Sequence, residues 1–275
     1  MKRSRGIIII SLLLICFTSG VISIGSYISR KQSENEYEAL RQAVSITEST
    51  TELITDELPP IMPIREATVR ATVKAKEEIT EKSAENVPEL PALGQTQAGY
   101  QASPGLMKLM SLNDAVKGWI QIDETRIDYP IMQNAEDNDY YLHRDINGKD
   151  SYPGSIYLDS NHDINATGLH VIYGHNMKNG TMFKDVTRFT DAAYLKRHQS
   201  AVIYTGEKEI RLSPVYCYAG PADGSYRGVY NSPEELEHFL YSKTGQKISG
   251  NIFVLITCSY GADNERTYCI LREDV

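Results

Sequence analysis

The sequence predicts a mostly β domain, a mixed and largely antiparallel barrel of eight short strands with peripheral helices. A transmembrane helix and a disordered stalk are predicted to precede it. Of the 24 aromatic residues in this 275-residue chain, 20 lie in residues 105–275, so the core must lie there. The same region alternates short runs rich in Ile, Val and Tyr with turn residues. An uncharged apolar run, by contrast, opens the chain.

Eight strands and four helices are predicted within this region. A serine followed by a proline opens two helices, 103–110 and 232–241, where the serine caps the helix and the proline takes its first position. In the second, Glu235 completes a capping box. Weaker helical patterns cover 138–145 and 191–198. The strands are predicted at 118–122, 127–132, 155–159, 169–174, 201–205, 209–219, 251–258 and 267–273.

Residues 1–29 are predicted to be a basic cytoplasmic tail followed by a transmembrane anchor. Three basic residues within positions 2–5 precede an uncharged run over 6–29, and about 20 apolar residues suffice to span a bilayer. The basic cluster favours a cytoplasmic N-terminus and places the rest of the chain outside the cell. A cleaved signal peptide, with its cleavage region near residue 20, is the alternative. Both interpretations place the domain outside the cell.

Residues 30–104 are predicted to be an extracellular stalk. They are rich in Glu, Thr and Pro and contain only two aromatic residues, so they cannot bury enough apolar surface to offset the conformational entropy of folding. Transient helices over 34–50 and 66–85 are compatible with this composition. Because a spacer contributes no core, we expect a chain that starts near residue 100 to fold and to be active.

Composition and charge exclude several classes of protein. The net charge of −8 makes the chain a poor match for a phosphate backbone, so no nucleic acid is expected as a partner. With 19 Gly and 11 Pro the chain is neither collagen-like nor of low complexity. Four cysteines are too few for a disulfide scaffold. The sequence contains no cluster of zinc or calcium ligands, so neither a metal nor another cofactor is expected.

Cys258 is a candidate nucleophile because of its place at a strand end. It closes the apolar strand 251–258 and opens a polar loop, so its thiol can be exposed and still rigidly held. Arg266 follows the loop; if the two strands pair as a hairpin, its guanidinium faces Cys258 and can favour the thiolate and bind an oxyanion. An ion pair of Arg266 with Asp263 or Glu265 at the turn is the alternative, and the spacing favours neither.

His175 is the candidate proton-transfer partner of Cys258. It follows the apolar strand 169–174 and enters a loop of Gly and Asn, a context that Cys258 shares. The other five histidines are expected to be structural. Cys217 and Cys269 lie in the middle of strands and are expected to be buried core thiols. No spacing rule supports a disulfide between them.

Three motifs follow one another in this domain: YGHNM at 173–177, TC at a strand end at 257–258, and an arginine eight residues after the cysteine. Longer stretches that carry the likeness surround them at 118–133, 137–149, 154–161, 171–186 and 255–273. Together they resemble the sortases, the membrane-anchored cysteine transpeptidases of Gram-positive bacteria, and among these class B. The resemblance spans nearly all of residues 105–275. It implies an eight-stranded sortase-type barrel with His175, Cys258 and Arg266 as catalytic residues.

The same resemblance implies an activity that needs neither ATP nor a metal. The Cys258 thiolate would cleave the C-terminal sorting signal of a secreted protein after a threonine and form a thioester. Arg266 would stabilise the oxyanion and His175 would protonate the departing amine. An amine of a peptidoglycan precursor or of a pilin would then accept the acyl group. The family's layout implies a single-pass protein of the cell membrane, with a cytoplasmic N-terminus and an extracellular catalytic domain.

Three further residues are implied as substrate contacts. In class B the helix before the third strand helps to wall the peptide groove, which places Asn138 and Leu142 beside the substrate. Ile256 stands in LITC, where family members often have a small polar residue. An isoleucine that faces the groove would change which signal is accepted.

Other classes of protein are weighed against this interpretation. An L,D-transpeptidase would carry a compact Ser-His-Gly-Cys block, whereas Ile256 and Thr257 precede Cys258 here. A papain-like protease would have its cysteine early and its histidine late, whereas His175 precedes Cys258 in this chain. A non-catalytic, surface-displayed binding barrel with a buried Cys258 is the remaining alternative. A thiol-reactive probe distinguishes it, because a buried thiol reacts only after unfolding.

Overall fold

The computed structural model describes residues 31–44, 99–259 and 261–274, together with Tyr27. The predicted anchor lies outside the described residues apart from Tyr27, and so does most of the predicted stalk. Within the described part of the chain, no helix combines the length and the apolar character needed to cross a bilayer.

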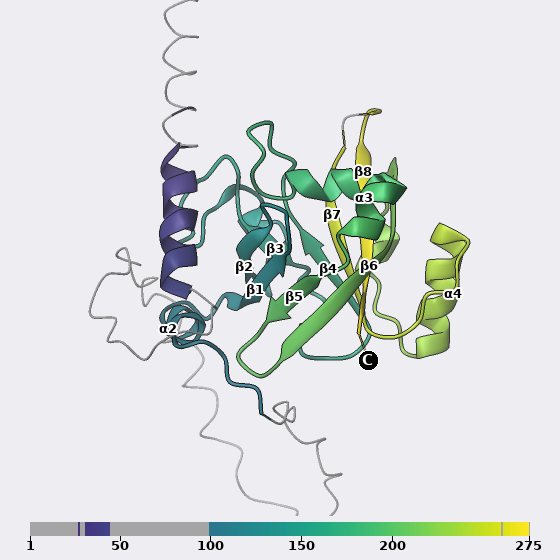
Figure 1. Ribbon diagram of the computed structural model, residues 1–275, viewed down its shortest axis with the longest axis horizontal. Helices are drawn as coiled ribbons and strands as arrows, with labels where there is room; N and C mark the ends of the chain where they lie inside the picture. The colour runs from purple at the N-terminus through teal and green to yellow at the C-terminus, as the bar shows by residue number, and fades with distance from the viewer. Residues whose placement is uncertain (1–26, 28–30, 45–98, 260, 275) are drawn as a thin grey trace, which may run out of the picture.

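Eight strands close into a barrel in the spatial order β1-β2-β3-β4-β7-β8-β6-β5 (Figure 1). They are β1 (Val116–Ile122), β2 (Asp128–Met132), β3 (Ile156–Leu158), β4 (Leu169–Tyr173), β5 (Ala201–Tyr204), β6 (Glu209–Pro221), β7 (Ile252–Cys258) and β8 (Glu265–Glu273). The pairs β2–β3 and β4–β7 are parallel, and the other neighbouring pairs are antiparallel. The predicted mixed barrel is thus confirmed, and each predicted strand overlaps one of these eight.

A short helix precedes the first strand, and further short helices lie in the connections between strands. They are α2 (Pro104–Leu112), η1 (Tyr140–His143), η2 (Lys184–Thr190), α3 (Ala192–Arg197), η3 (Gly224–Arg227) and α4 (Pro233–Thr244). The caps of both proline-led helices are confirmed, because Ser103 and Ser232 accept hydrogen bonds from the backbone N–H groups of Leu106 and Glu235. The pattern over 138–145 forms only the short 3-10 helix η1, which has no side-chain cap and ends where the backbone becomes extended.

Alternate side chains of the strands pack into two separate clusters. Inward-facing residues such as Leu255 form the core of the barrel. Outward-facing residues of β4, β7 and β8, such as Ile256, pack beneath the β6–β7 connection, which contains η3 and α4. We call this second group the outer cluster. Its buried members are Leu169, Val171, Tyr226, Leu236, Leu240, Ile248, Ile252, Val254, Ile256, Tyr268 and Ile270.

The beginning of the predicted stalk belongs to the folded domain. Residues 31–44 form a helix, called here the N-terminal helix, which lies against the barrel on the side opposite α4 (Figure 1). On one of its faces Tyr37, Leu40 and Val44 are 6%, 0% and 2% exposed and join the barrel core. Helix α2 packs against this helix at Gly105, so closely that a Cβ at Gly105 would lie 2.1 Å from a backbone oxygen of the N-terminal helix. The expectation that this segment contributes no core is therefore wrong.

We accordingly expect a chain that starts at residue 100 to be much less stable than one that starts at residue 31. Burial of three large side chains contributes roughly 5 kcal/mol, a large share of the roughly 5–15 kcal/mol that stabilises a typical domain. Urea unfolding of the two chains measures the difference in the free energy of unfolding. Equal unfolding midpoints would show that the N-terminal helix adds nothing to the stability of the barrel.

His170 in β4 is a buried histidine whose protonation opposes folding. Its ring stacks on Phe253 at 4.4 Å between centroids, and Nε2 lies 2.8 Å from Oδ1 of Asn251. Burial lowers the pKa of His170 to about 4. Between pH 6.5 and 4 the unfolded chain therefore binds a proton that the folded chain does not. The free energy of unfolding should fall by about 3 kcal/mol as the pH falls through this window.

Urea unfolding at pH 7 and pH 4.5 measures this dependence. The variant His170→Gln removes the titrating group, so its free energy of unfolding should change less between the two pH values. The same pH dependence in the variant would assign the acid sensitivity to other groups, such as His162, whose pKa burial also lowers.

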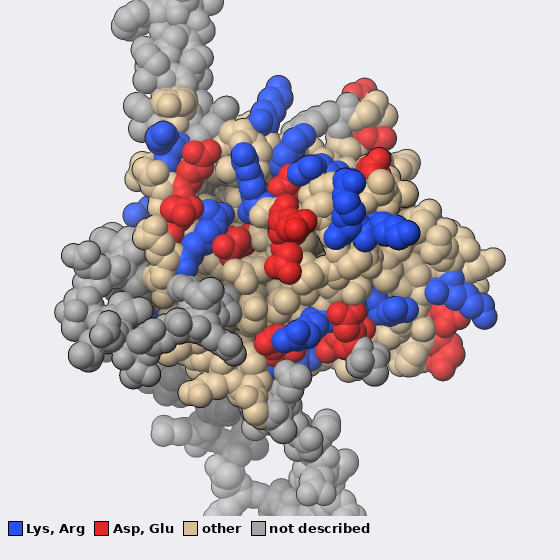
Figure 2. Space-filling model, in the orientation of Figure 1, with Lys and Arg blue, Asp and Glu red and all other residues tan. Residues whose placement is uncertain are grey.

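Charges of both signs are mixed on the face shown in Figure 2. Acidic and basic side chains lie side by side there, and the ion pairs of the domain include Arg211 with Glu209 at 2.7 Å. This face therefore offers no continuous positive surface to a phosphate backbone.

Candidate active site

Cys258 ends β7 and lies directly opposite Arg266 of β8. This pairing is the one expected if the two strands form a hairpin. The thiol of Cys258 is free and partly exposed. On its other side Arg266 pairs with Gly220 of β6, which has no side chain. A guanidinium at this position can therefore extend toward Cys258 without competition from β6.

The guanidinium of Arg266 is not neutralised by the acids of the turn. Its Nη1 donates to the backbone oxygen of Glu265 at 3.0 Å, and it forms no ion pair within the described residues. The carboxylate of Glu265 instead accepts hydrogen bonds from the Ser259 hydroxyl and, at 3.1 Å, from the Gly261 N–H. Glu265 thus holds the β7–β8 loop together, and the turn ion pair considered from the sequence does not form.

His175 reaches the same edge of the barrel because β4 and β7 run parallel. The last paired residues of these strands are Tyr173 and Ile256. His175 and Cys258 each stand two positions further on, so the two residues lie at the same end of the barrel. Asn176 donates from Nδ2 to the backbone oxygen of Cys258 at 2.8 Å. This bond ties the two strand ends together beyond their ladder.

The His175 imidazole is oriented by one hydrogen bond and one ring contact. Nε2 lies 2.8 Å from the backbone oxygen of Leu142. Because a carbonyl only accepts, Nε2 carries the hydrogen and Nδ1 is the nitrogen that can exchange a proton. The ring of His143 stacks on it at 5.2 Å between centroids. Burial lowers the pKa of His175, the bond to Leu142 opposes this, and His143 adds to the lowering. The imidazole is therefore mostly neutral at pH 7.

Leu142 contributes to the site through its backbone. Its side chain is partly buried against the barrel core. Gly154, at φ 59°, approaches its carbonyl so closely that a Cβ would lie 2.2 Å from the oxygen. Next to it, the N–H of Ser155 donates to the backbone oxygen of Tyr141 at 3.0 Å. The segment before β3 thus fixes η1 and, with it, the oxygen that orients His175.

Two other predicted contacts lie in the same region but are less available than expected. Asn138 accepts from the Ser160 N–H at 2.9 Å and donates to the Asp139 carboxylate at 3.3 Å, so both ends of its amide have partners within the chain. Ile256 is 7% exposed and belongs to the outer cluster. Their roles as substrate contacts stay predictions, as does that of Leu142.

Sequence reasoning missed a buried polar network beside the site. Oδ2 of Asp159, which is fully buried, accepts from the Tyr173 hydroxyl at 2.8 Å and from Arg227 Nε at 2.9 Å. Asp159 therefore joins β4 to η3, at the start of the connection that covers the outer cluster. The sequence feature that could have indicated this network was Asp159 itself, an aspartate at the end of a predicted strand. Its partner Arg227 lies 68 residues away, so no local pattern could reveal the pair.

Tyr157 of β3 is a second residue that the sequence did not single out. Its ring lies 5.2 Å from that of Tyr173, measured between centroids. Burial raises the pKa of Tyr157, and Cys258 is among the neighbouring groups whose charge adds to the rise. Tyr157, which is buried in β3, is therefore electrostatically linked to the thiol.

The arrangement brings three kinds of chemical group to one end of the barrel. Cys258 is a potential nucleophile, His175 can carry a proton on Nδ1, and Arg266 offers charged hydrogen-bond donors. Within the described residues, no three His, Cys, Asp or Glu side chains are grouped as metal ligands would be. A nucleophile, a proton carrier and an oxyanion-binding donor are together suited to acyl transfer.

Comparison with known proteins relates the chain to one group of enzymes. It is 31% identical over 188 residues to sortase B of Listeria monocytogenes, covering 64% of this chain and 76% of that protein. The solved structure of sortase B from Clostridium perfringens is 30% identical, with a TM-score of 0.55, over 62% of this chain and 99% of that one.

A structure from Bacillus anthracis, described as similar to sortase B, is 29% identical with a TM-score of 0.56. It covers 67% of this chain and 90% of that one. No family model matches the chain.

Proposed function

The chain belongs to the sortase B family of cysteine transpeptidases, and we propose that it cleaves a C-terminal sorting signal after a threonine and transfers the acyl group to an amine. One observation carries this proposal: Cys258 faces Arg266 across the hairpin, with His175 two residues beyond the end of the adjacent parallel strand β4. The partial exposure of Cys258 favours this function over a binding barrel with a buried thiol.

In the first half-reaction the Cys258 thiolate attacks the carbonyl carbon of the threonine, and a carbon–sulfur bond forms. The carbonyl oxygen becomes an oxyanion, to which Arg266 donates hydrogen bonds. The carbon–nitrogen bond then breaks, and the departing amine takes a proton from Nδ1 of His175. Because burial lowers the pKa of His175, its protonated form is a stronger acid toward that amine than an exposed imidazolium.

In the second half-reaction an amine attacks the thioester. His175, now neutral, accepts the proton that the amine loses, and the Cys258 thiolate leaves. The thioester retains much of the energy of the cleaved peptide bond, so neither ATP nor another cofactor is required. The chemistry of the acceptor fits an amine of a peptidoglycan precursor or of a pilin.

The sorting signal would lie extended on the outer face of the barrel, between β4, β7 and the β6–β7 connection. Ile256 precedes Cys258 by two residues on this face, so it would form the floor under the residue next to the scissile bond. The side chain of Leu142 and the loop at Asn138 would form the wall toward η1.

The location of the enzyme is part of the proposal. Secreted proteins with sorting signals meet it outside the cell, which fits a single-pass cell-membrane protein anchored by residues 1–29, with its N-terminus in the cytoplasm and its catalytic domain extracellular. That anchor lies outside the described residues.

Profiling over a library of five-residue signals tests the function. The purified protein should cleave a small subset of peptides after Thr, and mass spectrometry should detect an acyl group on Cys258. Added hydroxylamine should raise the turnover, because it replaces water as the acceptor of the acyl group. A library that yields neither cleavage nor an acylated Cys258 would refute the proposed function.

A further inference from the structure

The N-terminal helix contacts the segment that orients His175. The Tyr37 hydroxyl donates to the backbone oxygen of Gly154 at 3.1 Å and lies 3.3 Å from Oγ of Ser155. Gly154 is the residue that packs against the Leu142 carbonyl, and this carbonyl holds Nε2 of His175 at 2.8 Å. A short chain of contacts thus runs from the helix to the imidazole.

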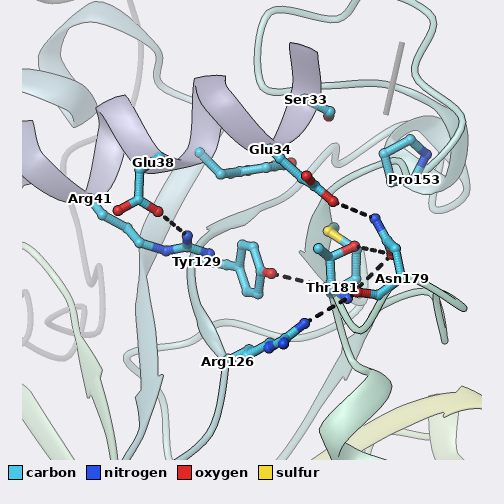
Figure 3. Close-up of a pocket in the computed structure, with 11 residues that line it drawn as sticks. Ser33, Glu34, Glu38, Arg41, Arg126, Tyr129, Pro153, Asn179 and Thr181 are labelled. Atoms are coloured by element: carbon cyan, nitrogen blue, oxygen red, sulfur yellow. Dashed lines mark hydrogen bonds and ion pairs between the residues drawn. The ribbon is translucent and has the colours of Figure 1, made fainter. Parts of the chain in front are cut away.

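The same helix also contacts the loop that follows His175. A cleft of about 340 Å³ lies between one part of the helix and the barrel, and Figure 3 shows Glu34 reaching across it to Asn179. The Glu34 carboxylate accepts from Nδ2 of Asn179 at 2.6 Å, and Arg126 donates to the Asn179 backbone oxygen at 3.2 Å. At the far end of this loop the Met182 N–H donates to the Tyr129 hydroxyl at 3.0 Å.

The loop between these anchors is closely tied to His175. Asn176 pairs with Met182 as an isolated bridge, and the N–H of Phe183 donates to the backbone oxygen of His175 at 2.9 Å. A displacement of the loop would therefore move the backbone of His175. A displacement of Gly154 would move the oxygen that orients its ring.

We propose that the N-terminal helix is a positioning element of the active site, in which Tyr37 and Glu34 hold the two supports of His175. This role goes beyond the proposed transpeptidation, because none of the residues that take part in its chemical steps precedes residue 105. Neither Tyr37 nor Glu34 touches the substrate in this proposal; both act through His175.

The contacts of Tyr37 and Glu34 should differ in how strongly they affect the position of His175. Tyr37 is 6% exposed, so its hydroxyl bond is formed away from water, and its loss leaves a buried carbonyl without that donor. The bond between Glu34 and Asn179 lies at the exposed surface, where water can replace it. Tyr37 is therefore expected to carry most of the effect.

Conservative variants test the proposal. Tyr37→Phe keeps the ring, which packs edge-on against Tyr129 at 5.2 Å between centroids, and removes only the hydroxyl. Glu34→Gln removes the charge that Asn179 contacts. Glu38→Gln is the matched control, because Glu38 lies on the same helix and lines the same cleft but forms its ion pair with Arg41 of that helix, at 2.9 Å.

Peptide cleavage and titration of the His175 imidazole by NMR are measured for each variant. In Tyr37→Phe we expect kcat to fall about tenfold with little change in KM, because misplacement of a catalytic group lowers the rate of the chemical step. The pKa of His175 should rise toward its ordinary value as water reaches the ring. The stacked ring of His143 and the titratable groups that line the same cavity, Tyr152 and Lys178, are unchanged in the variant, so the rise would report the position of His175.

Glu34→Gln should show the same changes to a smaller extent, and Glu38→Gln should show neither. An unchanged kcat and His175 pKa in Tyr37→Phe would overturn the proposal. So would equal effects in Glu38→Gln, or a fall in kcat that only matches the fraction of unfolded protein. The NMR titration needs no substrate, so it can fail or succeed independently of the proposed transpeptidation.

Discussion

Cys258→Ala is expected to abolish cleavage of a sorting-signal peptide, with a loss of roughly 10⁴-fold or more in kcat. The thiol is the nucleophile of the first half-reaction, and the carbon–sulfur bond of the thioester cannot form without it. Cleavage of the best library peptide, followed by chromatography, measures the loss. Activity above about one hundredth of the wild-type rate in the purified variant would show that Cys258 is not the nucleophile.

Cys217→Ala and Cys269→Ala are the matched controls for this result. The two residues pair across β6 and β8, and both belong to or pack against the barrel core. Burial raises the pKa of the Cys269 thiol well above its usual range, which makes it a poor nucleophile. Both controls should lose about 1 kcal/mol of stability and retain cleavage. A cleavage defect in either one without unfolding would place that thiol in the reaction.

Arg266→Lys is expected to lower kcat by roughly 10²–10³-fold, the scale for removal of one oxyanion donor. Lysine keeps the positive charge but loses the planar fork that can direct two hydrogen bonds to one oxygen. Arg266 faces Cys258 across the hairpin, so its donors can reach the carbonyl under attack. Measurement of kcat for peptide cleavage reports this loss.

The pH dependence of Cys258 alkylation separates two roles of Arg266. If Arg266 binds the oxyanion, Arg266→Lys should alkylate with a nearly unchanged pH midpoint. A midpoint raised by about one unit or more, with kcat falling only in proportion to the lost thiolate, would make Arg266 an electrostatic tuner of the thiol. Arg272→Lys is the control, because Arg272 lies on the same strand, opposite Ile252 at the far end of β7.

Those parts of the site that depend on residues close to one another along the chain were predictable from the sequence. A hairpin pairs residues that are close along the chain, so the loop between β7 and β8 was enough to place Arg266 opposite Cys258. The eight strands were equally predictable, because alternation and turn residues are local signals. The caps at Ser103 and Ser232 were predictable for the same reason.

The orientation of His175 depends on contacts that no local pattern encodes. His175 lies at the same end of the barrel as Cys258 because β4 and β7 pair in a parallel register, although the two strands lie far apart in the sequence. The oxygen that orients its ring belongs to Leu142, 33 residues earlier. The sequence singled out His175 by its context and by family resemblance, whereas tautomer and orientation were decided by the packing of η1 against the segment before β3.

The N-terminal helix shows most clearly where sequence reasoning ends. Composition correctly indicated that residues 30–104 are poor in apolar side chains, and this was taken to mean a spacer throughout. Tyr37, Leu40 and Val44 stand at helical spacing, but three apolar residues cannot stabilise an isolated helix in water. Their burial needs the surface that β2 and α2 offer once the barrel has closed. The sequence by itself therefore determined the barrel and the pairing of Arg266 with Cys258. The tertiary structure alone decided that this helix packs into the barrel core, because the partner surface exists only after folding.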